Sequence, residues 1–196
     1  MIIIGITGGI GSGKTTVASI FKEVFGVPVY IADVEAKNIM NHSKIVRRKV
    51  IELLGKQAYS KNSINRTFIA SKVFNDETLL NGLNAIIHPK VRKHFIKWVS
   101  KQKGNYVIKE AAILFENGSY KDCDKTILIT APLELRIERI LQRDQSTKHD
   151  IIKRMENQWD DKKKIHLADF VINNIKLSQT KAQVHKLHKL LSATVL

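Results

Sequence analysis

The sequence has few cysteines, few acidic residues and no long apolar run. Cys123 is the only cysteine among 196 residues, which excludes a disulfide framework and a metal site built from several thiolates. No apolar stretch approaches the length of about 18 residues that a membrane-spanning helix needs. Residues 1–4 lack the basic region and the cleavage site of a signal peptide, so we expect a core strand there. Together these absences predict a globular protein of the cytoplasm.

Acidic side chains are outnumbered by basic ones: 18 Asp and Glu stand against 33 Lys and Arg, for a net charge of +15. Such a balance attracts polyanions, and nucleic acid is the obvious candidate. The excess is concentrated in residues 88–103 and 175–196, which contain no acidic residue, whereas residues 136–164 mix both signs. Solvated helix faces explain runs of lysine equally well. A nucleoside triphosphate and a second phosphorylated substrate would also use this charge.

The most informative motif is Gly8-Gly9-Ile10-Gly11-Ser12-Gly13-Lys14-Thr15, which has the spacing G-x-x-x-x-G-K-[ST] of a phosphate-binding loop, or P-loop. An apolar run at residues 2–6 precedes it and a helical pattern follows. Glycines let successive N–H groups point at phosphate oxygens, and the amino end of the helix adds to the attraction. Lys14 would reach the β- and γ-phosphates, and the Thr15 hydroxyl would hold Mg²⁺. The sequence therefore predicts binding of a nucleoside triphosphate.

Short apolar runs alternate with helical patterns along the chain. The runs are rich in Val and Ile and do not alternate with polar residues, as in parallel strands covered on both faces. They lie at residues 2–6, 27–32, 106–108, 126–130 and 170–172. Gly26 is placed to end the first helix and Pro132 to occupy the first position of a later one. This order predicts an α/β fold of the P-loop NTPase type, with a doubly wound, parallel, five-stranded sheet.

The connection between the second and third strands is too long for a single crossover. Residues 34–103 read as mostly helical, including Phe68 to Leu83 as one stretch, and predict an inserted helical substrate domain that binds the acceptor. Residues 1–33 and 104–196 would then form the nucleotide-binding core. Residues 144–150 are a polar bridge between two helical stretches, so we expect a short lid at about residues 143–155.

Three acidic residues are candidates for the chemistry. Asp33 ends the second predicted strand, and ligands of open α/β sheets lie beyond such ends, so its carboxylate could accept a proton or order Mg²⁺. It could also cap a helix. Glu110 follows the third strand, where P-loop proteins keep the carboxylate that touches Mg²⁺, although Asp is commoner there. Glu116 is a candidate for contact with the substrate or for a surface charge.

Arginines cluster around the predicted lid. Arg136, Arg139 and Arg143 share one face of the helix that begins near Pro132, and Arg154 follows the lid. A planar, forked guanidinium neutralises the charge on a transferring phosphoryl group better than lysine does. We predict that at least one of them makes a catalytic contact, while any single one can be a solvated helix residue.

Two other patterns are not interpreted as sites. Thr147-Lys148-His149-Asp150 imitates the guanine-reading T-K-x-D of GTPases, but no apolar strand precedes it. His185 and His188 are spaced to clamp a metal, yet no acidic residue is near, so a surface helix is expected.

Taken in order along the chain, the motifs resemble those of the dephospho-coenzyme A kinase family. The resemblance starts in the P-loop and covers nearly the whole sequence. The other motifs are Ala32-Asp33, Asn65-Arg66, Val73-Phe74-Asn75-Asp76, Ile87-His88-Pro89-Lys90-Val91, Leu114-Phe115-Glu116, Arg139 with Arg143-Asp144, Arg154 with Gln158, and Ala168-Asp169-Phe170-Val171-Ile172-Asn173-Asn174.

The resemblance implies transfer of the ATP γ-phosphoryl group, with Mg²⁺, to the ribose 3′-hydroxyl of dephospho-coenzyme A, the last step of coenzyme A synthesis. It implies catalytic roles for Asp33 as base, Lys14 and Arg139, and a metal site at Thr15 and Glu110. The implied ATP-binding residues are Gly11, Ser12, Gly13, Lys14, Thr15, Thr16, Arg143 and Asn174. The implied acceptor-binding residues are Asp33, Arg66, Phe74, His88, Pro89 and Glu116. The small-molecule acceptor is the expected partner, with no nucleic acid and no membrane.

Two positions depart from the family pattern. Ile31 stands where these kinases usually have a first Asp, and Glu110 stands where they usually have Asp. A role of the first acid therefore cannot be carried over, and the metal geometry can differ. Two alternatives stay open: another small-molecule P-loop kinase, acting for example on a nucleoside monophosphate, and an ATP-dependent nucleic-acid-binding protein.

Overall fold

The computed structural model describes residues 1–61, 63–74 and 76–193, and the chain forms two compact units. The first consists of residues 1–31 together with the chain from Gln102 onward, and the second consists of residues 32–101. Each unit has an apolar core of its own. Asn75 of the Val73–Asp76 motif lies outside the described residues.

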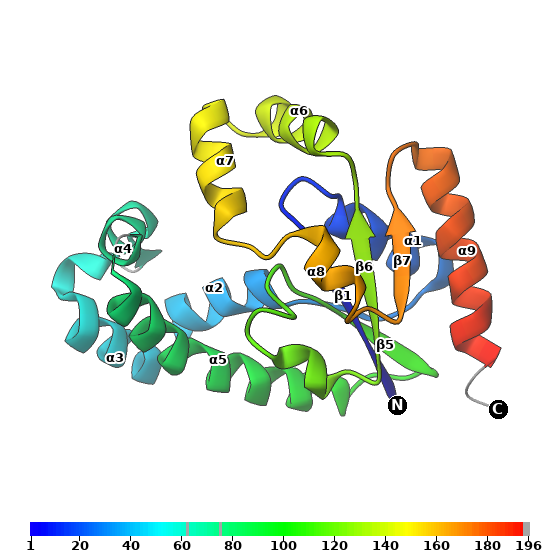
Figure 1. Ribbon diagram of the computed structural model, residues 1–196. Coiled ribbons are helices and arrows are strands. Elements are labelled where there is room, and N and C mark those ends of the chain that lie inside the picture. The colour runs from blue at the N-terminus through cyan, green and yellow to red at the C-terminus, as the bar shows by residue number, and fades with distance from the viewer. Residues whose placement is uncertain (62, 75, 194–196) are drawn as a thin grey trace. The chain divides into compact units, whose positions relative to one another are not determined.

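In the described part of the chain, the first unit is built on a five-stranded sheet with the order β2-β5-β1-β6-β7 (Figure 1). The strands are β1 (Ile2–Thr7), β2 (Val29–Ile31), β5 (Tyr106–Glu110), β6 (Lys125–Thr130) and β7 (Phe170–Asn173). All neighbouring pairs are parallel. The predicted α/β fold with a five-stranded parallel sheet is confirmed, and each predicted apolar run overlaps one of the strands.

Helices of the first unit cover the sheet and its carboxyl edge. They are α1 (Lys14–Phe25), α6 (Leu133–Arg143), α7 (Lys148–Glu156), α8 (Asp161–Ile165) and α9 (Leu177–Ala193), and a short 3₁₀ helix, η2, spans Ser119–Asp122. α1 and α9 pack against each other beside the sheet, whereas α6 and α7 lie beyond the carboxyl ends of β1 and β6 (Figure 1). The P-loop, which joins β1 to α1, therefore lies at the same edge as α6 and α7.

The core of the first unit consists of strand residues packed against α1 and α9. Ile4, Ile6, Ile127 and Ile129 are inaccessible to solvent in this cluster. Full burial of such a side chain stabilises the fold by about 1.5–3 kcal/mol, so the sheet holds the P-loop on a rigid base. α1 ends at Gly26, whose left-handed φ of 67° favours glycine, as predicted.

The second unit is mostly helical, as predicted. It contains α2 (Ala32–His42), α3 (Lys44–Leu54), η1 (Lys56–Ala58), α4 (Arg66–Val73) and α5 (Glu77–Val99). Val46, Val50, Ile69, Leu83 and Ile87 are buried in its core. A two-stranded antiparallel hairpin, β3 (Tyr59–Ser60) with β4 (Ser63–Ile64), also belongs to this unit and was not predicted. Its strands are too short to produce a recognisable alternation of apolar and polar residues.

Two predicted helix boundaries were wrong. The stretch from Phe68 to Leu83 is not one helix, because α4 ends at Val73 and α5 begins after Asp76. The Asp76 carboxylate accepts the N–H of Leu79 at 2.9 Å, which caps a new helix. Pro132 precedes the first residue of α6 instead of occupying it, so the predicted position is shifted by one residue.

The position of Asp33 also differs from the expectation. β2 ends at Ile31 and α2 begins at Ala32, so Asp33 lies in the first turn of a helix rather than at the end of a strand or at the cap. An acidic side chain in the first turn is favoured by the positive end of the helix dipole. Asp33 is exposed, and it follows Ile31, the last residue of β2, by two positions.

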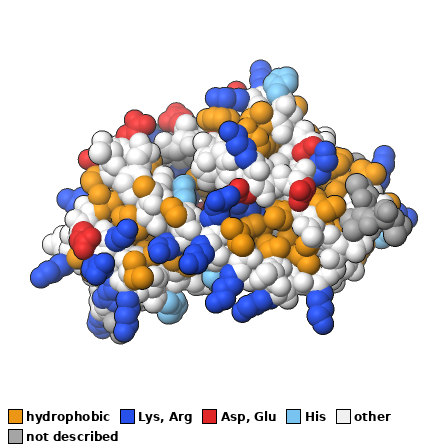
Figure 2. Space-filling view, turned by 90° about the horizontal axis from the view of Figure 1, so that it is seen from below, with side chains coloured by type: hydrophobic (Ala, Val, Ile, Leu, Met, Phe, Trp, Pro, Cys, Tyr) orange, Lys and Arg blue, Asp and Glu red, His pale blue; other side chains and the backbone are white. Residues whose placement is uncertain are grey.

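Basic side chains are spread over the surface. Figure 2 shows far more Lys and Arg than Asp and Glu on the face in view, with uncharged surface between many of them. None of the helices in the described part of the chain has the length and apolar character that crossing a membrane requires.

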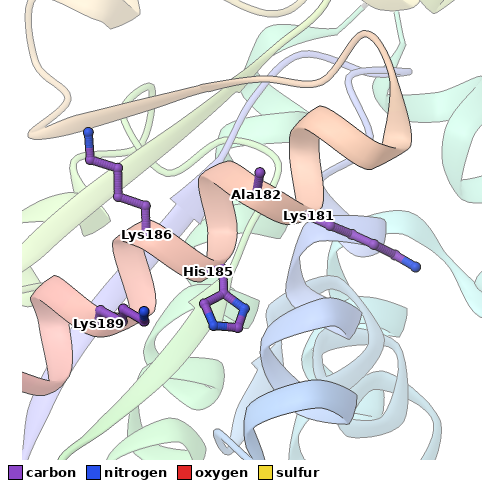
Figure 3. Close-up of a pocket in the computed structure, with 5 residues that line it drawn as sticks. All are labelled: Lys181, Ala182, His185, Lys186 and Lys189. Atoms are coloured by element: carbon purple, nitrogen blue, oxygen red, sulfur yellow. The ribbon is translucent and has the colours of Figure 1, made fainter.

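A shallow hollow of about 510 Å³ lies on α9. It is lined by Lys181, Ala182, His185, Lys186 and Lys189. In Figure 3 the side chains of Lys181 and Lys186 extend in different directions and do not converge on a common point. Because all of the lining residues come from one helix, we interpret the hollow as a basic helix surface and not as a built binding site.

His188 joins α9 to the core rather than forming a metal clamp with His185. Its ring stacks on Phe25 at 4.0 Å between centroids, and its Nδ1 lies 2.8 Å from the Tyr106 hydroxyl. Burial lowers the pKa of His188, and the nearby His185 lowers it further. The fold therefore favours the neutral ring.

This environment predicts a loss of stability on mild acidification. The unfolded chain takes up the His188 proton at a higher pH than the folded chain, so the free energy of unfolding falls as the pH drops through about 6.5. Urea denaturation of wild type and His188→Gln between about pH 7.5 and pH 5.5 should show a smaller slope in the variant, with a difference below the one-proton limit of about 1.4 kcal/mol per pH unit. Identical slopes would contradict the assignment.

Candidate active site

The P-loop residues Gly8–Gly13 connect β1 to α1 in a compact turn. The Ser12 N–H donates to the Gly9 carbonyl at 3.0 Å, which curls the loop back on itself. Gly13 precedes the first residue of α1, and no side chain caps this end of the helix. The first N–H groups of an uncapped helix need acceptors, and phosphate oxygens are suitable ones.

Asn174, which follows β7, packs closely against the P-loop. Gly13 has a left-handed φ of 91°, and a Cβ at this position would collide with the side-chain amide of Asn174. That amide donates to the Ser12 carbonyl at 2.8 Å, and its oxygen accepts the Thr180 hydroxyl at 2.8 Å. Asn174 was expected to bind ATP. In this structure its buried side chain binds the backbone of the P-loop.

Lys14 lies inside the curve of the loop. Its Nζ donates to the Gly8 carbonyl at 2.9 Å and lies 3.4 Å from the Gly9 carbonyl. The ammonium group is thus held beside the loop by backbone oxygens, which a stronger anionic acceptor can replace. Thr15 and Thr16 follow in the first turn of α1, and both are exposed.

Two polar atoms next to the loop are buried without a hydrogen-bond partner in the described structure. They are Ser12 Oγ and Arg139 Nη1. Arg139 Nη2 donates to the Ile175 carbonyl at 3.3 Å, which fixes the guanidinium with Nη1 near Gly13. A buried charged donor without a partner is costly, so this geometry suits an anionic ligand at the loop.

The oxygen atoms at this edge of the sheet fit Mg²⁺ bound together with a triphosphate. Glu110 is the last residue of β5 and pairs in register with Ile6 of β1, two residues before the P-loop. Its carboxylate and the Thr15 hydroxyl are hard oxygen donors of the kind that Mg²⁺ prefers. Among the described residues no group of three or more His, Cys, Asp or Glu could hold a metal. The remaining ligands would therefore be phosphate oxygens and water.

The arginines around the lid have separate partners. Arg136 Nε donates to the Ile10 carbonyl at 2.9 Å. Arg143 is exposed and pairs with the adjacent Asp144 at 2.8 Å, and Arg154 lies 3.5 Å from the same carboxylate. The hydrogen bond from Arg143 holds the pKa of Asp144 below its usual value. Of these arginines, Arg136 contacts the P-loop and Arg139 borders it.

The segment that imitates a guanine-reading motif is the start of a helix. Thr147 precedes α7, its hydroxyl accepts the Asp150 N–H at 3.2 Å, and the Asp150 carboxylate accepts the Thr147 N–H at 3.3 Å. This reciprocal pair is a capping box, which explains the spacing without a nucleotide base.

Glu116 forms a buried ion pair that was not predicted. Its Oε1 lies 2.8 Å from Nζ of Lys164, whose side chain is inaccessible to solvent. The same oxygen accepts the N–H of Trp159 at 3.2 Å. Glu116 was expected to contact the substrate or to be a surface charge, and in this structure its carboxylate joins the loop after β5 to α8.

Removing one partner of this pair should be strongly destabilising. In Glu116→Gln the buried Lys164 ammonium loses its counter-charge, for which we expect a cost of about 3–5 kcal/mol in the free energy of unfolding. The double variant Glu116→Gln/Lys164→Met removes both charges and should recover most of this loss. Urea denaturation measures both effects. A double variant no more stable than the single one would contradict a buried ion pair.

Besides Asp33, four of the residues expected to bind the acceptor lie on the second unit. Arg66 is the first residue of α4, and Phe74 follows the end of that helix with 52% of its surface exposed. His88 and Pro89 are exposed in the middle of α5, which continues through the proline. Three of the four therefore present charge or aromatic surface to solvent, as a binding region for a nucleotide-like molecule would.

Comparison with known proteins identifies the family. The family model described as dephospho-CoA kinase matches residues 2–179. A dephospho-CoA kinase from Bacteroides fragilis is 41% identical over 172 residues, covering 87% of this chain and 83% of that protein. One from Porphyromonas gingivalis is 40% identical over 158 residues, covering 81% and 78%.

Solved structures agree with this assignment. A crystal structure from Thermus thermophilus has a TM-score of 0.88 at 30% identity and covers 96% of both chains. Dephospho-CoA kinase from Campylobacter jejuni has a TM-score of 0.71 at 25% identity and covers 99% of this chain and 98% of its own. A shikimate kinase from Bacteroides thetaiotaomicron, at 19% identity and a TM-score of 0.51, shares the fold alone. Because the family model spans both units and the relatives cover most of the chain, this protein belongs to the dephospho-CoA kinase family.

Proposed function

We propose that this protein transfers the γ-phosphoryl group of ATP to the ribose 3′-hydroxyl of dephospho-coenzyme A. The hydroxyl oxygen forms a bond to the γ-phosphorus, the bond from that phosphorus to the bridging oxygen breaks, and ADP leaves. The hydroxyl proton passes to a base. The products are coenzyme A and ADP, so the reaction completes coenzyme A synthesis.

The observation that carries this proposal is the uncapped amino end of α1 beside Lys14 and Arg139. Backbone N–H groups from Gly11 to Thr16 would bind the β- and γ-phosphates. Lys14 and Arg139 would neutralise the charge that spreads over the transferring group. Arg139 Nη1, which has no hydrogen-bond partner among the described residues, supports this role, since a phosphate oxygen would satisfy it.

The Thr15 hydroxyl and the Glu110 carboxylate would hold Mg²⁺. When bound, the ion would neutralise charge on the β- and γ-phosphates. Glu110 is longer by one methylene than the Asp usual in this family. Its place at the end of β5, beside β1, still brings a carboxylate to the edge of the sheet where the P-loop begins.

Residues 34–103 would bind the acceptor, while residues 1–33 and 104–196 bind the nucleotide, with the lid at about residues 143–155. Arg66 and the other cations of this insertion would meet the pyrophosphate of dephospho-coenzyme A, and Phe74, His88 and Pro89 would contact the rest of it. Asp33 would accept the proton of the 3′-hydroxyl. Lys164 and the Trp159 N–H hold Oε1 of Glu116, and its Oε2, which has no hydrogen-bond partner among the described residues, would contact the acceptor.

An assay with a panel of acceptors tests the proposal. Purified protein is incubated with Mg-ATP and dephospho-coenzyme A, a nucleoside monophosphate or shikimate, and ADP release is followed. We expect ADP and a product carrying one more phosphate with dephospho-coenzyme A alone. Phosphorus NMR of the product should place the new group on the ribose 3′-oxygen. ADP release with a different acceptor, and none with dephospho-coenzyme A, would refute the assignment.

The net charge of +15 favours a second candidate, an ATP-dependent nucleic-acid-binding protein. Against it stand the spread of basic side chains over the surface in Figure 2 and the diverging lysines of α9 in Figure 3. Salt-dependent binding of DNA or RNA, with a slope that reflects several phosphates, would support this alternative. The cytoplasmic location stays a prediction from the sequence.

A further inference from the structure

Ile10, at the tip of the P-loop, is inserted into the lid region. Its side chain packs against an apolar cluster formed by Ile137 and Ile140 of α6 and Ile151 of α7. Met155 of α7 also contacts this cluster. A residue of the nucleotide-binding loop is thus part of the small core that joins α6 to α7.

Both backbone polar atoms of Ile10 are bound by side chains from this region. The Ile10 N–H donates to Oε1 of Gln158 at 2.8 Å, and the Ile10 carbonyl accepts Nε of Arg136 at 2.9 Å. Arg136 is itself held by Asp161 at 3.6 Å and is only 12% exposed. The orientation of the Ile10 peptide is therefore set by residues far from it in the sequence.

Gln158 connects three segments. Its Nε2 lies 3.4 Å from the carbonyl of Ala112, which follows Glu110 by two residues in the loop after β5. Its own N–H donates to the Met155 carbonyl at 3.0 Å, at the end of α7. The side chain is half-buried. The side-chain amide of Gln158 thus links the P-loop to the loop after β5. The backbone N–H of Gln158 is bonded to the end of α7.

We infer that Gln158 is a positioning residue for the P-loop. By accepting the Ile10 N–H it fixes this peptide and, through it, the neighbouring residues, Gly11 to Lys14, in the curved form that receives the phosphates. Gln158 does not touch the reacting atoms. It acts through Ile10, and its loss leaves a polar group of the loop unsatisfied and the loop less ordered. The inference rests on the proposed role of the P-loop in binding ATP.

Gln158→Met tests this role, because methionine keeps the length of the side chain and removes both hydrogen bonds. We expect the dissociation constant and the KM for ATP to rise about tenfold, the effect of losing about one hydrogen bond. The KM for dephospho-coenzyme A should change less than about twofold, since its site lies on other residues. Calorimetric titration with ATP and steady-state kinetics give the two readouts.

Gln183→Met is the matched control. The side-chain amide of Gln183 also binds backbone at both ends, accepting the Asn173 N–H and donating to the Asn173 carbonyl, each at 3.0 Å, with the Gln179 carbonyl 3.3 Å from its Nε2. Gln183→Met should lower the melting temperature about as much as Gln158→Met does. It should not raise the ATP dissociation constant. An unchanged ATP affinity in Gln158→Met would overturn the inference. Equal losses of ATP affinity in both variants would overturn it as well.

A measurement on the wild-type protein does not depend on the folding of a variant. Amide hydrogen exchange followed by NMR should show the Ile10 N–H protected before ATP is added, because Gln158 already binds it. An Ile10 amide that exchanges as fast as in an unfolded chain would refute the inference. Wild type that binds ATP but does not phosphorylate dephospho-coenzyme A would refute the proposed function instead, and the ATP affinities would still decide the role of Gln158.

Discussion

Replacing Lys14 with alanine is expected to lower kcat for coenzyme A formation by about 10²–10³-fold, the range for removal of one preorganised donor to a developing charge. The Lys14 ammonium already lies within the curve of the P-loop, bound to the carbonyls of Gly8 and Gly9. Phosphoryl transfer depends on positioning and charge neutralisation more than on covalent chemistry. Loss of this charge should therefore affect the chemical step more than the binding of the acceptor.

A second lysine of α1 provides the control. Lys22 lies in the last turn of the helix and is exposed, and Lys22→Ala should leave kcat within about twofold of wild type. The assay is ADP release at saturating dephospho-coenzyme A, with melting temperatures recorded for both variants. If Lys14→Ala kept more than about a tenth of the wild-type kcat, the ammonium would not be the main stabilising charge at the γ-phosphate.

The strands and the P-loop could be predicted because their signals are local. The apolar runs around Ile4, Ile108 and Ile129 need only their own residues to be recognised, and the glycines and Lys14 lie within one short motif. The order of the strands could not be obtained in this way. β1 pairs with β5 and β6, which lie about a hundred residues away, and such pairing depends on long-range packing.

The contacts of single polar residues could not be predicted from the sequence either. Lys164 ends the run Asp160-Asp161-Lys162-Lys163-Lys164, which looks like a solvated charged segment, yet its side chain is fully buried against Glu116. Gln158 appeared in the family resemblance only as a companion of Arg154, and an uncharged amide carries no signal of what it binds. In both cases the role arises from contacts between distant parts of the chain.

The arginines of α6 show how well helical spacing predicts which side chains lie near the P-loop. Arg136 and Arg139 do lie near the P-loop, at Ile10 and Gly13, as a shared helix face predicts. Arg143 occupies the last turn of α6 and pairs with the next residue, Asp144. Arg143 therefore has a short-range partner at the end of its helix, which periodicity alone does not indicate.

Asp33→Asn is expected to lower kcat by about 10²–10⁴-fold, the usual contribution of a general base. Asp33 follows the last residue of β2 by two positions, and β2 ends at the same edge of the sheet as β1. Two strand spacings separate β2 from β1, so the ends of the two strands lie about 10 Å apart. The carboxylate can accept the proton of the acceptor hydroxyl, whereas the amide of asparagine cannot.

The split between kinetic constants distinguishes a base from a binding residue. Because Asp33 would act on the hydroxyl proton, the KM for ATP in Asp33→Asn should stay within about threefold of wild type while kcat falls. Glu35→Gln, an acidic residue in the same first turn of α2, is the matched control and should retain kcat. Full activity of Asp33→Asn would exclude a base at this position. A rise in the KM for dephospho-coenzyme A with unchanged kcat would instead identify Asp33 as an acceptor-binding residue, since a carboxylate that only holds the substrate does not stabilise the transition state selectively.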